Sequence, residues 1–184
     1  MRDLVRQGSA HPGVIAAAHR VVRYVPERDD RATMQALLTN VRRRMRYTHD
    51  PLDVELVKAP WVSLAGSETS AEPMDCDDAS VMLASMLGAV GIPSQFVVVP
   101  TNAAKPGGWS HVYVKARAED GSWVPLDPIV RKYPAGREVP DSDLTGPRAA
   151  FPAGMSGPTP SPASVAPMAL IALAASVFFL KRSN

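Results

Sequence analysis

Three residues of the chain, Cys76, His111 and Asp127, are of the types that together carry out thiol-based nucleophilic catalysis. In such chemistry a cysteine thiolate attacks a carbonyl carbon, and a histidine takes the thiol proton and later gives it to the leaving amine. A carboxylate fixes the tautomer of the imidazole and stabilises its charged form. Cys76 is the only cysteine among 184 residues, so an internal disulfide is excluded, and the surrounding elements must decide its role.

The segment 75–93, DCDDASVMLASMLGAVGIP, predicts a helix that presents Cys76 in its first turn. Asp75 is a favourable N-cap, and Gly91 followed by Pro93 ends the helix. The apolar residues recur at helical spacing, at Ala79, Met82, Leu83, Met86, Leu87 and Val90. We therefore expect one buried helix face and a thiol close to the unpaired N–H groups of the first turn.

Two opposite influences act on the Cys76 thiol. The backbone N–H groups at a helix N-terminus favour a thiolate. The adjacent carboxylates of Asp77 and Asp78 disfavour a further negative charge. Because a lone cysteine is commonly a small buried apolar side chain, a structural role and a nucleophilic role both stay open for Cys76 at this point.

Two β-rich segments, 111–116 and 123–126, flank the turn signal Glu119-Asp120-Gly121 and predict a β-hairpin. In the register of a three-residue loop, Asp127 lies one diagonal step from His111, and a slip by one pair would put the two residues directly opposite. Either register places both side chains on the same face. Taken singly, a strand histidine is more often structural, and an aspartate before a proline is a common turn residue.

The remaining elements also follow from periodicity and turn signals. We expect helices at 12–24 and 30–47, a long loop at 51–74, a buried strand at 95–99 and a flexible loop at 101–108. Pro125 indicates that the strand at 123–126 lies near a sheet edge. The second helix ends in a basic run, Arg42, Arg43, Arg44 and Arg46, which we interpret as a solvated face that complements the helix dipole.

The amino-acid composition limits the classes of function that this chain can have. Apolar residues make up 46% of the chain and the net charge is +2, which suits a globular domain of about 150 residues and gives no indication of nucleic-acid binding. The N-terminus, MRDLVRQGSAHPG, has no apolar core of a signal peptide, so we expect a cytoplasmic domain.

Three motifs, DCDDASVMLASMLGAVGIP, SHVYVKA and GSWVPLDP, resemble the transglutaminase-like superfamily, which is related to the papain-like cysteine peptidases. In that family a cysteine opens a helix that ends in a Gly-Ile-Pro-like turn, a histidine lies on a following strand, and an aspartate follows a tryptophan on the next. The resemblance implies an α+β fold in which N-terminal helices and the nucleophile-bearing helix pack on a small antiparallel sheet. It assigns Cys76 as the nucleophile, with His111 and Asp127 completing the triad.

The resemblance covers about residues 10–135, and the leading helices with RRMRYTHDPLDVE look like versions found in bacteriophage and prophage proteins. The sequence departs from the family where Val112-Tyr113 replaces a common Ala-Trp and where Ser94-Gln95 replaces a frequent arginine. Family members include peptidases, amide hydrolases, amide cross-linking enzymes and inactive relatives. The resemblance therefore implies a cysteine-dependent amide hydrolase or acyltransferase that forms a thioacyl-enzyme on a protein or peptide substrate, without a cofactor.

Further residues are candidates for the cleft. An oxyanion hole would use the Cys76 backbone N–H and a second donor, for which Trp61 is a candidate, although packing is the commoner role of a tryptophan. Trp109 and Tyr113 either wall the cleft or pack in the core, and the loop at Gly107-Gly108 is a candidate lid. A metal site built from the side chains of Asp75, Asp77, Asp78 and His111 is a weaker alternative, because their spacing matches no metal motif.

The C-terminal part changes in composition. We predict a transglutaminase-like domain at 1–147, a Pro/Gly/Ser-rich linker at 148–164, a hydrophobic and possible transmembrane helix at 165–180 and a basic tail at 181–184. Such a tail would anchor the domain to a membrane or place it in a virion. The alternative to an enzyme is a non-catalytic, membrane-associated or virion structural module that keeps the fold.

Overall fold

The computed structural model describes residues 1–50 and 56–154. The hydrophobic helix predicted at 165–180, the basic tail and most of the predicted linker lie outside these residues. Within the described part, no helix has both the length and the apolar character needed to cross a membrane.

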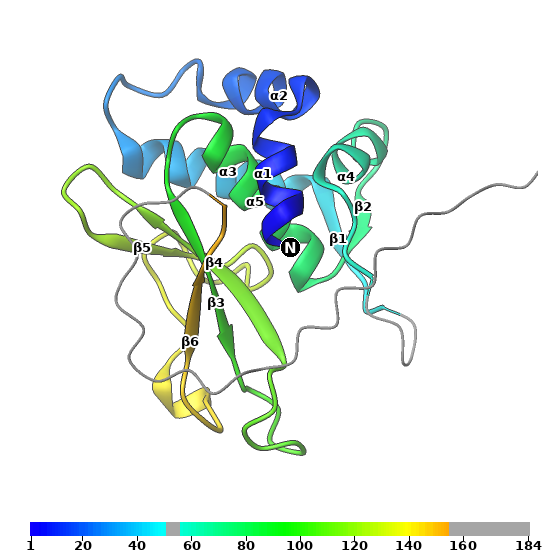
Figure 1. The fold of residues 1–184 in the computed structure, drawn as a ribbon, viewed down its shortest axis with the longest axis vertical. Coiled ribbons are helices and arrows are strands. Elements are labelled where there is room, and N and C mark those ends of the chain that lie inside the picture. Colours follow the sequence, from blue (N-terminus) through cyan, green and yellow to red (C-terminus); the bar gives the residue numbers. More distant parts are fainter. Residues whose placement is uncertain (51–55, 155–184) are drawn as a thin grey trace, which may run out of the picture.

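A helical layer surrounds the helix that begins at Cys76 (Figure 1). The helices are α1 (Arg2–Ala10), α2 (Pro12–Val22), α3 (Asp30–Arg44), α4 (Pro60–Gly66) and α5 (Cys76–Ala89), with a short 3-10 turn, η1, at Asp141–Asp143. All four other helices pack against α5. Every residue from Asp78 to Leu87 of α5 is buried, so this helix is enclosed on all sides rather than on one face.

The helical layer covers one face of a four-stranded antiparallel sheet with the order β5-β4-β3-β6. Its strands are β3 (Ser94–Val99), β4 (His111–Arg117), β5 (Trp123–Leu126) and β6 (Ala149–Pro152). A second small sheet pairs β1 (Met45–Tyr47) in parallel with β2 (Glu72–Met74). The mixed α and β architecture, with α5 packed on an antiparallel sheet, agrees with the predicted fold class.

The local signals around the cysteine and the hairpin are confirmed. Asp75 caps α5 through its carboxylate, which accepts the backbone N–H of Asp78 at 3.0 Å. Gly91 follows the helix with a φ of 82°, a conformation that suits glycine. The β4–β5 hairpin has the register expected for a three-residue loop, with Val114 opposite Leu126, and β5 is an edge strand.

Four predictions of local structure were wrong or incomplete. The helix predicted at 30–47 ends at Arg44, because Met45–Tyr47 pairs with β2. The predicted loop at 51–74 contains α4 and β2, and Arg2–Ala10, for which no helix was predicted, forms α1. Residues 149–152, predicted as part of the linker, form β6 on β3. Short elements stabilised by distant segments carry little periodicity of their own, so composition alone did not reveal them.

Candidate active site

The N-terminal end of α5 docks on β4 at Val112, the residue next to His111. The Ser80 hydroxyl, one turn after Cys76, donates to the Val112 carbonyl at 3.2 Å. The backbone N–H of Val112 is close enough to the Cys76 sulfur to lower the pKa of the thiol. Because β5 pairs with β4 only from Val114 onward, the main chain of Val112 is available to α5. These contacts place the thiol beside the histidine strand.

His111 and Asp127 form the hydrogen bond that the hairpin register predicts. The His111 Nε2 atom lies 2.8 Å from Oδ2 of Asp127, and both side chains are largely buried. The other carboxylate oxygen, Oδ1, accepts the backbone N–H groups of Ile129 at 2.9 Å and Val130 at 3.0 Å. Asp127 is therefore both a turn residue and the partner of the imidazole, and neither oxygen is free to rotate away.

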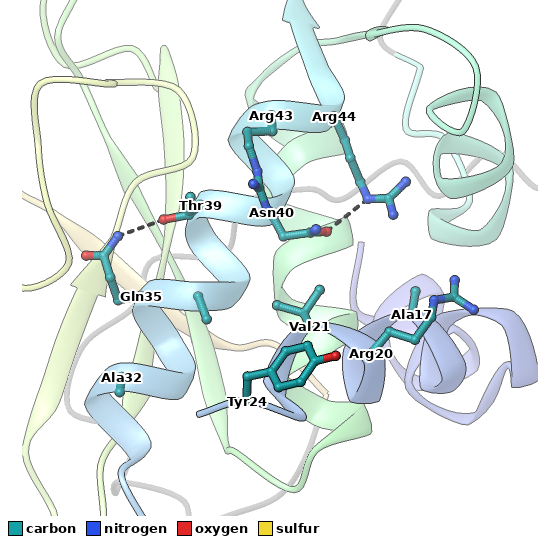
Figure 2. A pocket seen from close by; sticks show the side chains of 11 residues that line it. Ala17, Arg20, Val21, Tyr24, Ala32, Gln35, Thr39, Asn40, Arg43 and Arg44 are labelled. Carbon is teal, nitrogen blue, oxygen red and sulfur yellow. Dashed lines mark hydrogen bonds between the residues drawn. The ribbon is translucent and has the colours of Figure 1, made fainter. Parts of the chain in front are cut away.

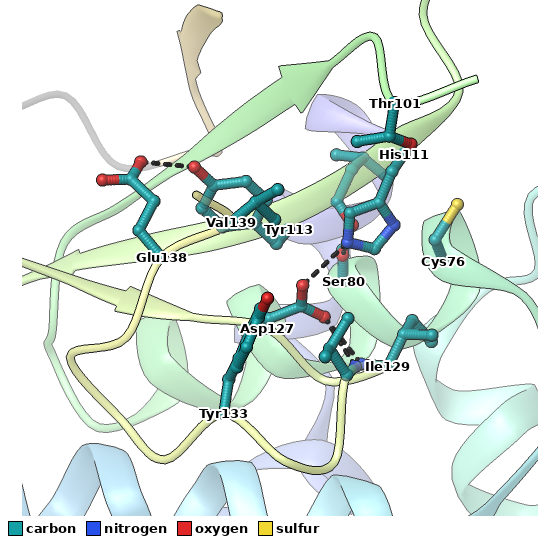
Figure 3. A network of polar contacts seen from close by, with 12 residues as sticks. Cys76, Ser80, Thr101, His111, Tyr113, Asp127, Ile129, Tyr133, Glu138 and Val139 are labelled. Carbon is teal, nitrogen blue, oxygen red and sulfur yellow. Dashed lines mark hydrogen bonds and ion pairs between the residues drawn. The ribbon is translucent and has the colours of Figure 1, made fainter. Parts of the chain in front are cut away.

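The charge of Asp127 determines which nitrogen of His111 carries a proton. Burial alone would raise the pKa of Asp127, but the hydrogen bond and charge of His111, together with the N–H groups of Val130 and Ile129, hold this pKa below its usual range. A carboxylate accepts only, so Nε2 must be the donor. Figure 3 shows the other ring nitrogen, Nδ1, on the side that faces Cys76. With its hydrogen on Nε2, the ring offers the Nδ1 lone pair toward the thiol.

The Cys76 thiol holds its proton strongly in this resting structure. Burial first, and then the charges of Asp77 and Asp75, raise its pKa to about 12, although the N–H groups of Val112 and of Cys76 itself lower it. The thiol donates a long hydrogen bond, with 3.9 Å between Sγ and Oδ1 of Asp77. Cys76 is therefore a thiol rather than a preformed thiolate.

The two carboxylates after Cys76 have different environments. Asp78 is buried, accepts the backbone N–H of Lys58 at 2.6 Å, and lies 3.6 Å from the Lys58 ammonium group. Asp77 is half-buried and lies against the sulfur. Asp78 thus joins α5 to the residues before α4, whereas Asp77 opposes ionisation of the thiol.

Arg42 of α3 holds the segment that carries Asp127. Its guanidinium group donates to the backbone carbonyls of Asp127 at 2.6 Å, Val130 at 3.0 Å and Tyr133 at 2.6 Å. In return, Arg131 donates to the carbonyl of Arg42 at 2.9 Å. The prediction of a solvated basic face was therefore wrong for Arg42. The usable signal was its position one turn after the buried Leu38, on the inward face of the helix.

Tyr47 is a residue near the thiol that the sequence did not indicate. Burial first, and then the charges of Cys76 and Asp75, raise the pKa of its phenol. Its hydroxyl oxygen lies 3.3 Å from Nδ1 of His49. Tyr47 ends β1, and its pairing opposite Met74 of β2 brings it close to the start of α5.

The three aromatic cleft candidates have different positions. Tyr113 is fully buried, its hydroxyl bonds the Glu138 carboxylate, and its ring stacks under His111 with 6.1 Å between centroids. It packs against the imidazole, and a role in the wall of the cleft stays a prediction. Trp61 stacks on His11 with 5.1 Å between ring centroids. Trp109 is 39% exposed in the loop before β4, which leaves it accessible to a ligand.

In residues 1–50 and 56–154, no group of three or more histidine, cysteine, aspartate or glutamate side chains could hold a metal ion. The acidic residues beside Cys76 have other partners: Asp75 caps α5 and Asp78 binds Lys58. The arrangement of the site suits thiol chemistry assisted by a histidine.

Comparison with known proteins identifies the family. The sequence model of the transglutaminase-like superfamily matches residues 18–128, a segment that contains Cys76 and His111 and ends just after Asp127. The chain belongs to the transglutaminase-like superfamily. No curated protein sequence matches it.

Solved structures of low sequence identity share the fold. A candidate cysteine protease from Cytophaga hutchinsonii has a TM-score of 0.52 at 13% identity, over 83% of this chain and 48% of that one. A candidate protease from Parabacteroides distasonis has a TM-score of 0.51 at 17% identity, over 72% of this chain and 26% of that one. Red sea bream transglutaminase is more distant, with a TM-score of 0.41 at 14% identity over 69% of this chain and 26% of that one, and it supports no conclusion about this chain. The chain thus spans about half or less of these proteins.

Proposed function

We propose that this transglutaminase-like domain is a cysteine-dependent amide hydrolase or acyltransferase that acts through a thioacyl-enzyme on a protein or peptide. The observation that carries the proposal is the 2.8 Å hydrogen bond from His111 Nε2 to Asp127, which leaves Nδ1 as the proton acceptor on the side of Cys76. Cys76 would be the nucleophile, His111 the general base and acid, and Asp127 the orienting carboxylate.

The proton and the carbon–sulfur bond would move together in this mechanism. Because burial and Asp77 keep the proton on sulfur, Nδ1 of His111 would take it as Sγ attacks the carbonyl carbon. The resulting imidazolium is stabilised by Asp127. It then gives the proton to the leaving amine nitrogen as the C–N bond breaks, which leaves an acyl group on sulfur. Attack by water or by a second amine, whose proton His111 accepts, releases the acyl product and restores the thiol.

The developing oxyanion needs donors near the sulfur. The backbone N–H of Cys76, in the first turn of α5, is one. For the second, the Tyr47 hydroxyl is our candidate, because the pairing of β1 with β2 sets Tyr47 opposite Met74, two residues before Cys76. Trp61, whose ring is stacked on His11, is the other candidate.

A second candidate function is a non-catalytic module that keeps the fold, and the strongly protonated thiol favours it. Attachment to a membrane through residues 165–180 is a separate prediction. It is compatible with either function, because the linker would separate the tail from the domain.

The rate at which an activated ester acylates Cys76 distinguishes the catalytic from the non-catalytic function. The protein is mixed with p-nitrophenyl acetate, and intact-mass spectrometry follows the added acetyl group and its position. We expect acetylation of Cys76 that slows at least about 100-fold in His111→Ala, because a positioned general base contributes about that much or more. Thermal unfolding of the variant verifies its fold. Equal rates for the two proteins would refute catalysis by this pair.

A further inference from the structure

A groove on the helical layer lies outside the candidate active site. It runs between α2 and α3 with a volume of about 600 Å³, and a second hollow of about 360 Å³ lies beside residues 67–70. The two hollows share Asn40, Arg43 and Arg44, so they form one continuous depression, which we call the α2–α3 groove. Cys76, His111 and Asp127 do not line it.

The α2–α3 groove carries positive charge that the described residues do not neutralise. Arg20, Arg43 and Arg44 line it, and Glu68 is its one acidic lining residue. Burial lowers the pKa of Arg44, and the like charges of Arg20 and Arg43 lower it further, against the opposite effect of Glu68. In residues 1–50 and 56–154, neither Arg20 nor Arg43 forms an ion pair.

Figure 2 shows the two sides of the groove, with Arg20 and Tyr24 on the α2 side and Arg43 and Arg44 on the α3 side. Arg44 is committed to the protein, because it donates to Asn40 at 2.9 Å and to Ser67 at 3.1 Å. Arg20 and Arg43 are exposed and have no hydrogen bond within the described part of the chain. Their guanidinium groups are therefore available for a carboxylate, which they bind well through two parallel N–H bonds.

The apolar part of the groove lining, which we call the floor, is made of small residues, and Gln35 and Thr39 beside it are already paired. The floor consists of Ala17, Val21, Ala32 and Ala36. The Gln35 side chain donates to the Thr39 hydroxyl at 2.9 Å and accepts the Ala135 N–H at 3.0 Å. Small apolar side chains of a ligand can thus be buried between the helices while acidic groups reach the arginines above them.

Two other occupants fit this surface less well. A nucleic acid needs aromatic stacking platforms and a larger basic area, but Tyr24 is the one aromatic lining residue and the chain has a net charge of only +2. Residues 155–184 of this chain contain Lys181 and Arg182 and no acidic residue, so the groove would repel their charges. The complementary occupant is an acidic segment of another protein.

We propose that the α2–α3 groove binds an acidic peptide segment of a protein partner, with its carboxylates on Arg20 and Arg43 and its small apolar side chains on the alanine floor. The binding step needs no reaction at Cys76. If the proposed function also holds, a natural occupant would be an acidic stretch of the protein substrate, held on the helical layer away from the thiol. That last identification alone rests on the proposed function.

Fluorescence anisotropy on the full-length Cys76→Ser protein tests binding without turnover. The probes are a labelled short peptide of glutamate, alanine and leucine, the same peptide with glutamine in place of glutamate, and a single-stranded oligonucleotide of the same charge. We expect saturable binding of the acidic peptide, and binding of the glutamine peptide and of the oligonucleotide at least about tenfold weaker. Failure of the acidic peptide to bind, or tighter binding of the oligonucleotide, would overturn the proposal.

A pair of double variants locates the binding site. Arg20→Gln with Arg43→Gln should weaken binding of the acidic peptide at least about tenfold, because both open guanidinium groups are lost. The control, Arg2→Gln with Arg28→Gln, removes two exposed arginines outside the groove and should leave binding within about twofold. Thermal unfolding of both proteins verifies folding. Equal losses in the two double variants would show that only net charge matters and would contradict a site in the groove.

Discussion

The two halves of the candidate active site differ in how firmly the protein fixes them. On the hairpin side, both carboxylate oxygens of Asp127 accept hydrogen bonds, and one of these comes from Nε2 of His111. The ring of Tyr113 stacks on the imidazole. On the helix side, the Cys76 thiol is half-buried, protonated and turned toward Asp77. In the proposed mechanism the proton-accepting group is thus preorganised, whereas the nucleophile becomes reactive only when the proton moves to His111.

The physical reason lies in what each half requires. Orientation of an imidazole needs fixed hydrogen-bond partners, and a hairpin with its turn supplies them locally. Ionisation of a thiol needs compensating positive charge, but the charges of Asp77 and Asp75 oppose it here, whereas the backbone N–H groups of Val112 and Cys76 favour it. The following predictions test this difference between the halves, from the largest expected effect to the smallest.

Exchange of the orienting carboxylate for an amide should have the largest effect. In Asp127→Asn, the side-chain amide can donate to Nε2 of His111 and so favour the tautomer with its proton on Nδ1, which faces the thiol. We expect acylation of Cys76 to slow at least about 100-fold, with little loss of the fold. Stopped-flow measurement of p-nitrophenol release gives the rate. An unchanged rate would mean that the hairpin half does not set the tautomer.

Loss of the Arg42 guanidinium should destabilise the hairpin half of the site, because Arg42 holds the segment that begins at Asp127. Arg42→Met leaves three carbonyls without their donor, and we expect a loss of about 2–4 kcal/mol in the free energy of unfolding. Urea unfolding measures this loss. Arg43→Met, one residue along α3 and exposed, is the matched control and should change the free energy by less than about 0.5 kcal/mol. Similar losses in both variants would contradict the clamp on the 127–133 segment.

The protonated thiol predicts a particular dependence of stability on pH. A group whose pKa is higher in the folded than in the unfolded state stabilises the fold below the unfolded value and loses this contribution as pH rises. For Cys76 the window lies between the ordinary thiol pKa of 9.0 and the folded value of about 12. We expect the free energy of unfolding to fall there by at most about 1.4 kcal/mol per pH unit more than in Cys76→Ser. Parallel pH curves of the two proteins would exclude a raised thiol pKa.

Removal of the Asp77 charge should make the Cys76 thiol more reactive without altering the hydrogen bonds of His111 and Asp127. In Asp77→Asn we expect a lower thiol pKa and alkylation by iodoacetamide that is several times faster, up to about tenfold, near neutral pH. Asp78→Asn is the matched control, because Asp78 bonds Lys58 rather than the thiol. It should change stability and leave the alkylation rate almost unaltered. Faster alkylation in the control instead would reverse the roles of the two carboxylates.

The sequence predicted the parts of the site that depend on local structure. The Asp75 cap, the placement of Cys76 in the first helical turn and the hairpin register all follow from neighbouring residues, and all three are present in the structure. From these features the proximity of His111 and Asp127 could be inferred before the fold was known.

The missed features depend on contacts between distant segments. Tyr47 approaches Cys76 because β1 pairs with β2, and neither three-residue strand is long enough to show a period. Arg42 clamps a segment far along the chain, whereas a run of arginines is usually solvated. The orientation of Asp77 toward the sulfur and of Asp78 toward Lys58 likewise required the structure, because adjacent identical residues carry no signal that distinguishes them.

The protonation state of the pair tests the central claim most directly. Long-range nitrogen–proton NMR of the imidazole side chains at about pH 8 reports which nitrogen of His111 carries hydrogen. We predict hydrogen on Nε2, a free lone pair on Nδ1, and a change in the Nδ1 signal on Cys76→Ser. Hydrogen on Nδ1, or a doubly protonated ring beside a Cys76 thiolate, would contradict this account of a preorganised base and a protonated nucleophile.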